Sequence, residues 1–221
     1  MNRMSSRVRI LAALMLLGCL AGAAPAFAQG YYYRSQPVDR PVQWFVNGGA
    51  AITQSDTNTN FNNGWSVGGG VNIKPASGPF MLRLDLNYSY FDASDQLIAA
   101  NPNANYGYME TLTGFADGVF EVPFNPWTRF YLMAGPGFGW RGVYLTQDAG
   151  VYCTPYFCGP GYGAGAVVGR DTSTNFAWNA GVGVDFALPG GQSWFFEARY
   201  ERLQTSNAPT EFIPLRVGFR F

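Results

Sequence analysis

The chain has 221 residues, a formal net charge of zero and no histidine, and its aromatic residues (17%) outnumber its charged residues (13%). Soluble domains usually contain about 25% charged residues, so something other than charge must cover the surface of this protein. The length allows one large domain or two small ones with a real core, and the balanced charge gives no indication of a nucleic-acid partner.

The first 28 residues have the pattern of an export signal. A basic stretch without acids, MNRMSSRVR, precedes the apolar run ILAALMLLGCLAGAA, and AFA at 26–28 fits a small-x-small cleavage site before Gln29. The segment LLGC at 16–19 also resembles a lipobox in which Cys19 would be lipidated, and this alternative stays open. The apolar run continues past Cys19, which favours cleavage before Gln29.

Alternation of apolar and polar residues predicts strands throughout the rest of the chain. In FMLRLDLNYSYF at 80–91, every second residue from Phe80 is a large apolar or aromatic one. The predicted strands are 42–53, 65–74, 80–91, 108–122, 129–142, 175–188, 193–203 and 211–221. Each is near or above the length of about 9–11 residues that a tilted strand needs to cross a bilayer. Pro136 lacks a ladder donor, so we expect a bulge in the strand that contains it.

Short and long connections alternate between these strands. PASGP, PFNPW and PGGQ are tight, whereas QSDTNTNFNNG, DASDQLIAANPNANYG and the segment 146–172 are long. Short periplasmic turns and longer external loops are typical of outer-membrane barrels. The fourth external loop, SNAP, is short and weakens the pattern, and we interpret SDTNTNFNN in the first loop as a solvated spacer.

The last strand ends on an aromatic residue in the middle of its pattern. PLRVGFRF at 214–221 resembles the C-terminal strand of outer-membrane β-barrels, in which the assembly machinery reads alternate apolar positions and a terminal aromatic. The corresponding assembly-signal positions here are Leu215, Val217, Phe219 and Phe221. Together with FAWNAGVGVDFAL at 176–188, this strand makes residues 42–221 similar to the small eight-stranded outer-membrane β-barrel domain family, a porin-type family with OmpA-like, OmpX-like and OmpW-like members.

The resemblance implies an all-β fold: an eight-stranded antiparallel transmembrane β-barrel, closed between 42–53 and 211–221. It implies a cleavable signal peptide (1–28), a periplasmic segment (29–41) and a location in the outer membrane, with both barrel termini in the periplasm. The implied partners are outer-membrane lipid, lipopolysaccharide and the barrel-assembly machinery, and the implied state is a monomer. The strands of a secreted β-sandwich also alternate apolar and polar residues, so this fold remains an alternative. It would not need tryptophans near both ends of its strands, as at Trp44, Trp127, Trp194, Trp65 and Trp140.

If the apolar faces meet lipid, the opposite faces place acids and bases inside the barrel. The interior charge network in this register is Arg83, Asp85, Asp117, Glu121, Arg129, Arg141, Asp185, Glu197, Arg199, Glu201, Arg216 and Arg220. Buried charges persist when they are paired, and eight strands leave an interior about wide enough for side chains to fill. We therefore favour a salt-bridged plug, and keep an ion or proton path as the alternative.

Catalysis and cofactor binding have little support in the sequence. Without histidine, Ser-His hydrolysis and other histidine-based schemes are unavailable, and the known barrel enzymes that act on lipid depend on a histidine that this chain lacks. Glu197 and Glu201 lie about 13 Å apart on one strand face, which is wide for a shared acid–base task. No zinc set or EF-hand spacing occurs, so we expect no cofactor, no metal site and no enzyme.

The third external loop is the remaining place for a function. Cys153 and Cys158 can form a disulfide in an oxidising compartment, which would close a small ring at the tip of the loop. We expect this tip to expose Tyr152, Tyr156, Phe157 and Tyr162 as contacts for a surface ligand, or to act as a lid that stabilises the rim. The sequence thus predicts a plugged barrel with a structural and surface-interaction role. The alternatives are a narrow channel for small or apolar solutes and, more distantly, a lipid-modifying enzyme.

Overall fold

A computed structural model of the protein describes residues 40–221 except for 76–77, 148–150, 155–156, 161–165 and 206–207. The expected signal peptide, Cys19 and the segment 29–39 lie outside the described residues. Among the residues described, no helix is long and apolar enough to cross a membrane.

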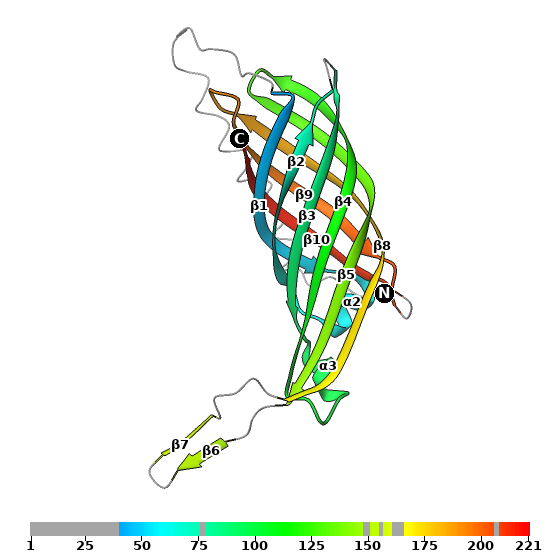
Figure 1. Ribbon diagram of the computed structural model, residues 1–221, viewed down its shortest axis with the longest axis vertical. Helices are drawn as coiled ribbons and strands as arrows, with labels where there is room; N and C mark the ends of the chain where they lie inside the picture. Colours follow the sequence, from blue (N-terminus) through cyan, green and yellow to red (C-terminus); the bar gives the residue numbers. More distant parts are fainter. Residues whose placement is uncertain (1–39, 76–77, 148–150, 155–156, 161–165, 206–207) are drawn as a thin grey trace, which may run out of the picture. The chain divides into compact units, whose positions relative to one another are not determined.

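Eight antiparallel strands close into a barrel (Figure 1). Around the ring, each strand pairs with its neighbour in the chain, and the last strand pairs with the first, so that Phe45 lies opposite Arg220 and Thr53 opposite Phe212. The strands are β1 (Val42–Thr53), β2 (Gly64–Ile73), β3 (Phe80–Asp92), β4 (Tyr106–Asn125), β5 (Thr128–Gln147), β8 (Ala166–Ala187), β9 (Ser193–Leu203) and β10 (Thr210–Arg220). The predicted eight-stranded fold and its closure are confirmed.

The two faces of each strand differ sharply in exposure. On β3, Leu84 and Leu86 are 40% and 51% exposed, whereas Arg83 and Asp85 are 0% and 7% exposed. The hydrocarbon therefore faces outwards and the charges face inwards, the reverse of a soluble barrel. An outer surface of this kind is stable against lipid rather than against water.

Three strands are much longer than predicted. β5 and β8 extend towards the external end, where Tyr106 pairs with Thr146 and Gln147 pairs with Ala166, and β4 is extended at both of its ends. The segment 146–172 was predicted as a loop, but Val167 and Val168 favour extended backbone and the continued ladder satisfies the peptide groups. Beyond this extension, β6 (Val151–Thr154) and β7 (Phe157–Pro160) form a separate two-stranded sheet.

The expected bulge at Pro136 was wrong. The β4–β5 register is the same on both sides of Pro136, from Phe115 opposite Gly137 to Gly118 opposite Ala134. A missing donor removes a hydrogen bond but inserts no residue, so the ladder is interrupted without a shift. The register shifts instead at Pro123–Asn125, beside a periplasmic turn, and at Leu145–Thr146.

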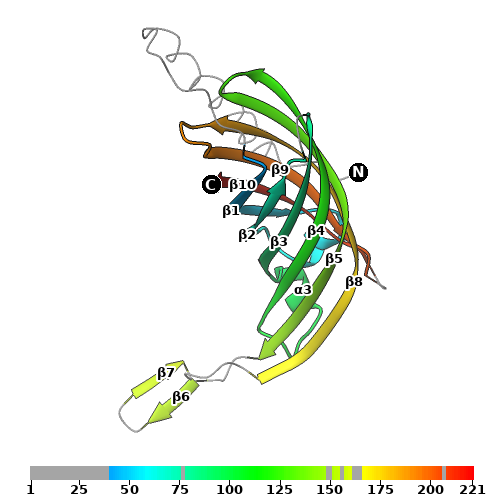
Figure 2. The ribbon, with the colours of Figure 1, turned by 45° about the horizontal axis from the view of Figure 1, so that its top comes forward.

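The first external loop is not the solvated spacer expected from its composition. It contains α2 (Ser55–Asn60), and the side chains of Thr57 and Phe61 are buried. The second loop contains α3 (Asp95–Ala99; Figure 2). A hydrogen bond from Ser94 Oγ to the carbonyl of Thr59, at 2.8 Å, joins the two loops. These loops pack together at the external end, where Phe61 pairs with Ala93 of the second loop and its ring is buried in the apolar interior of the barrel.

Two apolar clusters lie inside the barrel at different heights. The external cluster, near the outer ends of the strands, consists of Ala51, Phe61, Phe91, Met109, Phe115, Ala177, Leu203 and Phe212. The periplasmic cluster consists of Phe45, Met81, Val119, Tyr131, Met133 and Phe195. The buried charged and amide side chains lie next to and between these clusters, so hydrocarbon flanks the polar interior on both sides.

Candidate functional site

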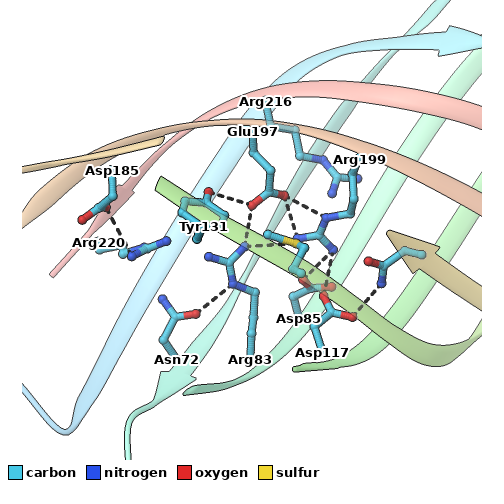
Figure 3. A network of polar contacts seen from close by, with 12 residues as sticks. Asn72, Arg83, Asp85, Asp117, Tyr131, Asp185, Glu197, Arg199, Arg216 and Arg220 are labelled. Carbon is cyan, nitrogen blue, oxygen red and sulfur yellow. Dashed lines mark hydrogen bonds and ion pairs between the residues drawn. The ribbon is translucent and has the colours of Figure 1, made fainter. Parts of the chain in front are cut away.

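Arg83, Glu197, Arg199 and Asp85 form the centre of the charged interior (Figure 3). Arg83 pairs with Glu197 through Nη1 and Oε2, and Arg199 Nη2 lies 2.7 Å from the other carboxylate oxygen of Glu197. Arg199 Nη1 also lies 2.8 Å from Asp85 Oδ2 and 3.4 Å from Asp117 Oδ2. All five side chains are fully buried, so each charge depends on its partners for stabilisation.

Neutral side chains add hydrogen bonds to this centre. The hydroxyl of Tyr131 donates to Glu197 Oε2 at 3.0 Å, and Arg83 Nε donates to Asn72 Oδ1 at 2.8 Å. On the other side, Asn179 donates to Asp117 Oδ1 at 2.7 Å. Each of these bonds is charge-assisted, which makes it stronger than a bond between two neutral groups.

The periplasmic cluster also stabilises the arginines through its rings. The guanidinium carbon of Arg83 lies 4.9 Å from the ring centre of Phe45 and 5.3 Å from that of Tyr131. Arg220 lies over Tyr131 and Phe195 at 5.2 and 5.0 Å. Arginine suits this position because its planar, weakly hydrated cation stacks on aromatic faces.

A second group of ion pairs lies at the periplasmic end. Asp185 lies 3.2 Å from Arg220 Nη1 and 3.3 Å from Arg129 Nη2, while Glu121 lies 3.3 Å from Lys74 Nζ and 3.7 Å from Arg129 Nη1. Sequence reasoning missed Lys74. The glycines of β2 have no side chains and so give no alternation of apolar and polar residues. Asn72 and Lys74 lie on either side of the apolar Ile73, and this pattern could have placed Lys74 inside the barrel.

A third pair, Arg216 with Glu201, lies on the external side of the centre. Arg216 Nη2 is 2.8 Å from Glu201 Oε1, and both side chains are fully buried. Arg141, which the sequence placed in the interior network, lies nearer the external rim and pairs with Asp171 at 2.7 Å. With Lys74 counted in place of Arg141, six cations face six carboxylates inside the barrel: Lys74, Arg83, Arg129, Arg199, Arg216 and Arg220 against Asp85, Asp117, Glu121, Asp185, Glu197 and Glu201.

Several buried polar atoms near this network have no hydrogen-bond partner among the described residues. They include both polar atoms of the Asn47 side chain, Asn87 Oδ1, Arg216 Nη1 and Arg83 Nη2. Other such atoms belong to Asp117 of β4, Asn179 of β8 and Glu201 of β9, so the unsatisfied groups are spread around the interior. Buried polar groups of this kind are normally satisfied by water.

The tip of the third external loop is a hairpin. β6 pairs with β7 so that Cys153 lies directly opposite Cys158 and Tyr152 opposite Gly159. The side chains of Tyr152 and Phe157, and the whole of Tyr156 and Tyr162, lie outside the described residues. Within the described part of the chain, no three acidic or cysteine side chains are grouped as metal ligands would be.

The outer wall of the barrel carries aromatic residues at both ends. Trp44 and Trp194, near the periplasmic ends of their strands, are 58% and 48% exposed, and Trp65, near the external end of β2, is 49% exposed. Trp65 begins a row of stacked tyrosines that continues across β3, β4 and β5. Two aromatic belts of this kind mark the two membrane interfaces.

Comparison with known proteins agrees with this geometry. Residues 11–221 match the family model described as "Outer membrane protein beta-barrel domain". The fold is similar to that of Neisserial surface protein A (TM-score 0.56, 13% identity, covering 82% of this chain and 96% of that one). It is also similar to a major outer membrane protein from Thermus thermophilus (TM-score 0.50, 12% identity, covering 82% and 99%). Comparison with curated proteins finds no match.

Proposed function

Because the chain belongs to the outer membrane protein β-barrel domain family, and so lies in the outer membrane, we propose that it is a closed, non-catalytic barrel that presents its external loops to surface ligands. The paired charges of the interior support the first part of this proposal, that the barrel is closed. Arg83, Arg199 and Glu197 occupy the centre of the barrel with side chains that are 0% exposed.

An interior of buried, paired charges resists ion flow. An ion that crossed it would have to displace Arg199 from three carboxylates, and a buried pair that loses one partner is destabilised by about 3–5 kcal/mol. The external cluster, which includes Phe91 and Phe212 in edge contact at 5.2 Å, adds an apolar layer that an ion would also have to cross.

Single-channel recording of the refolded protein in a planar bilayer at neutral pH tests this half. We expect no reproducible openings. Stable, discrete openings that change when Arg83 or Asp185 is neutralised would instead show that the charged interior conducts.

The second candidate is a narrow path for small solutes, as in the OmpW-like resemblance. The unsatisfied polar atoms of Asn47, Asn87 and Arg216 favour it, because buried polar groups without a protein partner are normally satisfied by water. The same recordings distinguish the two functions, since a hydrated path gives openings that depend on the charges beside it.

The external loops support the second part of the proposal, the presentation of a surface for ligands. The β6–β7 hairpin lies between β5 and β8 in the chain, and its register brings Cys153 and Cys158 opposite each other. A disulfide there would hold the tip in one conformation, which reduces the entropy lost on binding. An epitope inserted between Pro155 and Tyr156 should be accessible to antibody on intact cells, and an epitope that becomes accessible only after lysis would contradict presentation at the surface.

A further inference from the structure

Four hydrogen-bond donors in the periplasmic part of the interior have no hydrogen-bond partner among the described residues. They are Asn72 Nδ2, Arg83 Nη2, Arg220 Nε and Arg220 Nη2. The three side chains come from β2, β3 and β10 and are at most 2% exposed, so bulk water does not reach these atoms. A buried donor without an acceptor is destabilising, and several such donors at one place indicate a ligand that accepts hydrogen bonds from all of them.

The three side chains that carry these donors lie close together. The guanidinium carbons of Arg83 and Arg220 lie 5.3 and 5.2 Å from the ring centre of Tyr131, and 5.6 and 5.0 Å from that of Phe195. Arg83 Nε donates to Asn72 Oδ1 at 2.8 Å, which holds the amide beside the guanidinium and leaves Nδ2 as its unpaired atom. In Figure 3, the ends of Arg83 and Arg220 lie beside each other, with the amide nitrogen of Asn72 near both.

Neighbouring groups of the protein do not satisfy these donors. The rings of Tyr131 and Phe195 lie against both guanidinium groups, but an aromatic face accepts an N–H group much more weakly than an oxygen atom or an anion does. The unpaired acceptor nearest in the network, Asp185 Oδ2, lies 3.3 Å from Arg129 Nη2 and so faces another cation. The rings also keep water away, which increases the cost of leaving the donors unpaired.

Positive charge is in local excess around these donors. Each carboxylate that contacts Arg83 or Arg220 also contacts a further cation, as in the pairs of Glu197 with Arg199, Asp185 with Arg129, and Glu121 with Lys74 and Arg129. Arg199 has two further carboxylate partners of its own, so the other four cations share three carboxylates. A monovalent anion would neutralise this local excess, whereas a divalent anion would reverse it.

A small anion suits these donors better than a water molecule does. Water accepts about two hydrogen bonds and must also place its own two protons, but all four unpaired atoms here are donors. A halide ion accepts hydrogen bonds from every direction and adds the negative charge that the surrounding cations lack. It could enter from the periplasm, because Lys74 and Arg129 are 19% and 17% exposed at that end and would attract it towards Arg220.

We propose that the barrel interior binds one monovalent anion of halide size between Arg83, Arg220 and Asn72. The ion accepts hydrogen bonds from the four donors and links β2 and β3 to β10, on the other side of β1. This site goes beyond the closed-barrel function and does not depend on it, because the ion enters and leaves at the periplasmic end without crossing the barrel.

Asn72→Asp tests the site by supplying the negative charge from the protein itself. The carboxylate keeps one oxygen for Arg83 Nε and places a second oxygen where the amide nitrogen was, so the donors gain an acceptor without an ion. Asn47→Asp is the matched control, because it adds the same charge elsewhere in the interior. Asn47 lies four residues beyond Gln43, the register partner of Asn72, or about 13 Å along the strand at ~3.3 Å per residue.

Urea titration of the refolded protein in lipid measures binding, when sodium chloride is compared with sodium gluconate at equal ionic strength. In the unaltered protein and in Asn47→Asp, chloride should raise the urea midpoint along a saturable curve. The rise should be about 0.5–1.4 M when chloride is at about ten times its dissociation constant. In Asn72→Asp, the midpoint should be the same in both salts. Heat-dependent gel mobility establishes that each variant is folded.

Two results of this titration would overturn the proposal. A chloride effect of equal size in all three proteins would show that the ion acts somewhere other than at Asn72. Equal midpoints in both salts for the unaltered protein would show that no chloride is bound.

Bromide locates the ion without any variant. Crystals of the unaltered protein grown in sodium bromide should show an anomalous peak between Arg83, Arg220 and Asn72. Density for a water molecule at this place, without an anomalous signal, would overturn the proposal, because the donors would then be satisfied by water.

Discussion

Arg83 and Glu197 meet in the middle of the barrel, where Nη1 of the arginine pairs with Oε2 of the carboxylate and neither side chain is exposed. The two residues come from β3 and β9, strands that are not neighbours in the ring. Their pairing therefore crosses the interior and joins opposite walls. Such a contact stabilises the barrel against deformation as well as neutralising two buried charges.

Removal of one partner of this pair should strongly destabilise the barrel. Arg83→Met leaves Glu197 with Arg199 as its remaining close cation, and we expect the free energy of unfolding to fall by about 3–5 kcal/mol. Urea titration of the refolded protein in lipid, followed by tryptophan fluorescence, measures this change. Lys74→Met is the control, because Lys74 is 19% exposed at the periplasmic end and should cost about 1 kcal/mol or less.

The double variant Arg83→Met with Glu197→Gln separates pairing from packing. If the cost of Arg83→Met comes from a carboxylate that has lost one of its two buried cations, the double variant should be more stable than the single one. A double variant at least as unstable as the sum of the two single changes would contradict this account of the interior.

A glycine opposite Tyr131 should be intolerant of any side chain. Gly183 pairs directly with Tyr131 across β5 and β8, and a Cβ at position 183 would overlap the tyrosine ring. Gly183→Ala must therefore displace the ring that donates to Glu197, at an expected cost of about 1–3 kcal/mol. The urea titration used for Arg83 measures it. Gly118→Ala is the matched control on β4, where the nearest atom to an added Cβ is 3.9 Å away; an equal loss in both would contradict the steric argument.

The strands of the barrel were predictable because their two faces meet chemically different surroundings. Leu82, Leu84 and Leu86 alternate with Arg83 and Asp85. A period of two residues places the leucines on the face towards lipid and the charged residues on the face towards the interior. β2 was harder to assign, because Gly68, Gly69 and Gly70 have no side chains to alternate.

Features that depend on contacts between distant segments could not be read from the sequence. SDTNTN is polar and short, and it forms a helix because Thr57 Oγ1 accepts a hydrogen bond from the backbone of Glu211 and Phe61 is buried in the barrel mouth.

The two cysteines of the β6–β7 hairpin should be oxidised in protein from the outer membrane. Cys153 and Cys158 are register partners, and directly opposite residues of an antiparallel pair are about 4.5–5.5 Å apart at Cα, within the range of a disulfide. We expect mass spectrometry to find both thiols blocked to alkylation until a reductant is added. In Cys153→Ser, Cys158 should react without reductant. Alkylation of both thiols in the unreduced protein would show that the tip is not closed by a disulfide.

Deletion of Phe221 should impair assembly. The backbone of Phe221 exchanges two hydrogen bonds with Trp44, at 2.9 and 3.2 Å, so the last residue closes the periplasmic end of the ring. Its ring stacks on that of Phe219, 6.4 Å away, on the outer wall. Loss of Phe221 removes both the closing bonds and the terminal aromatic that the assembly machinery reads in resembling barrels. We expect the heat-modifiable fraction in outer membranes to fall several-fold.

Phe221→Tyr is the control for changing the last residue without removing its backbone hydrogen bonds or its aromatic ring. It keeps the backbone bonds to Trp44 and the aromatic ring, and we expect it to assemble as the unaltered chain does. Phe221→Gly keeps the backbone bonds alone, so its assembly measures the contribution of the ring. Normal insertion of the deletion variant would refute the role assigned to this residue, because neither the closing bonds nor the aromatic would then be needed to complete the barrel.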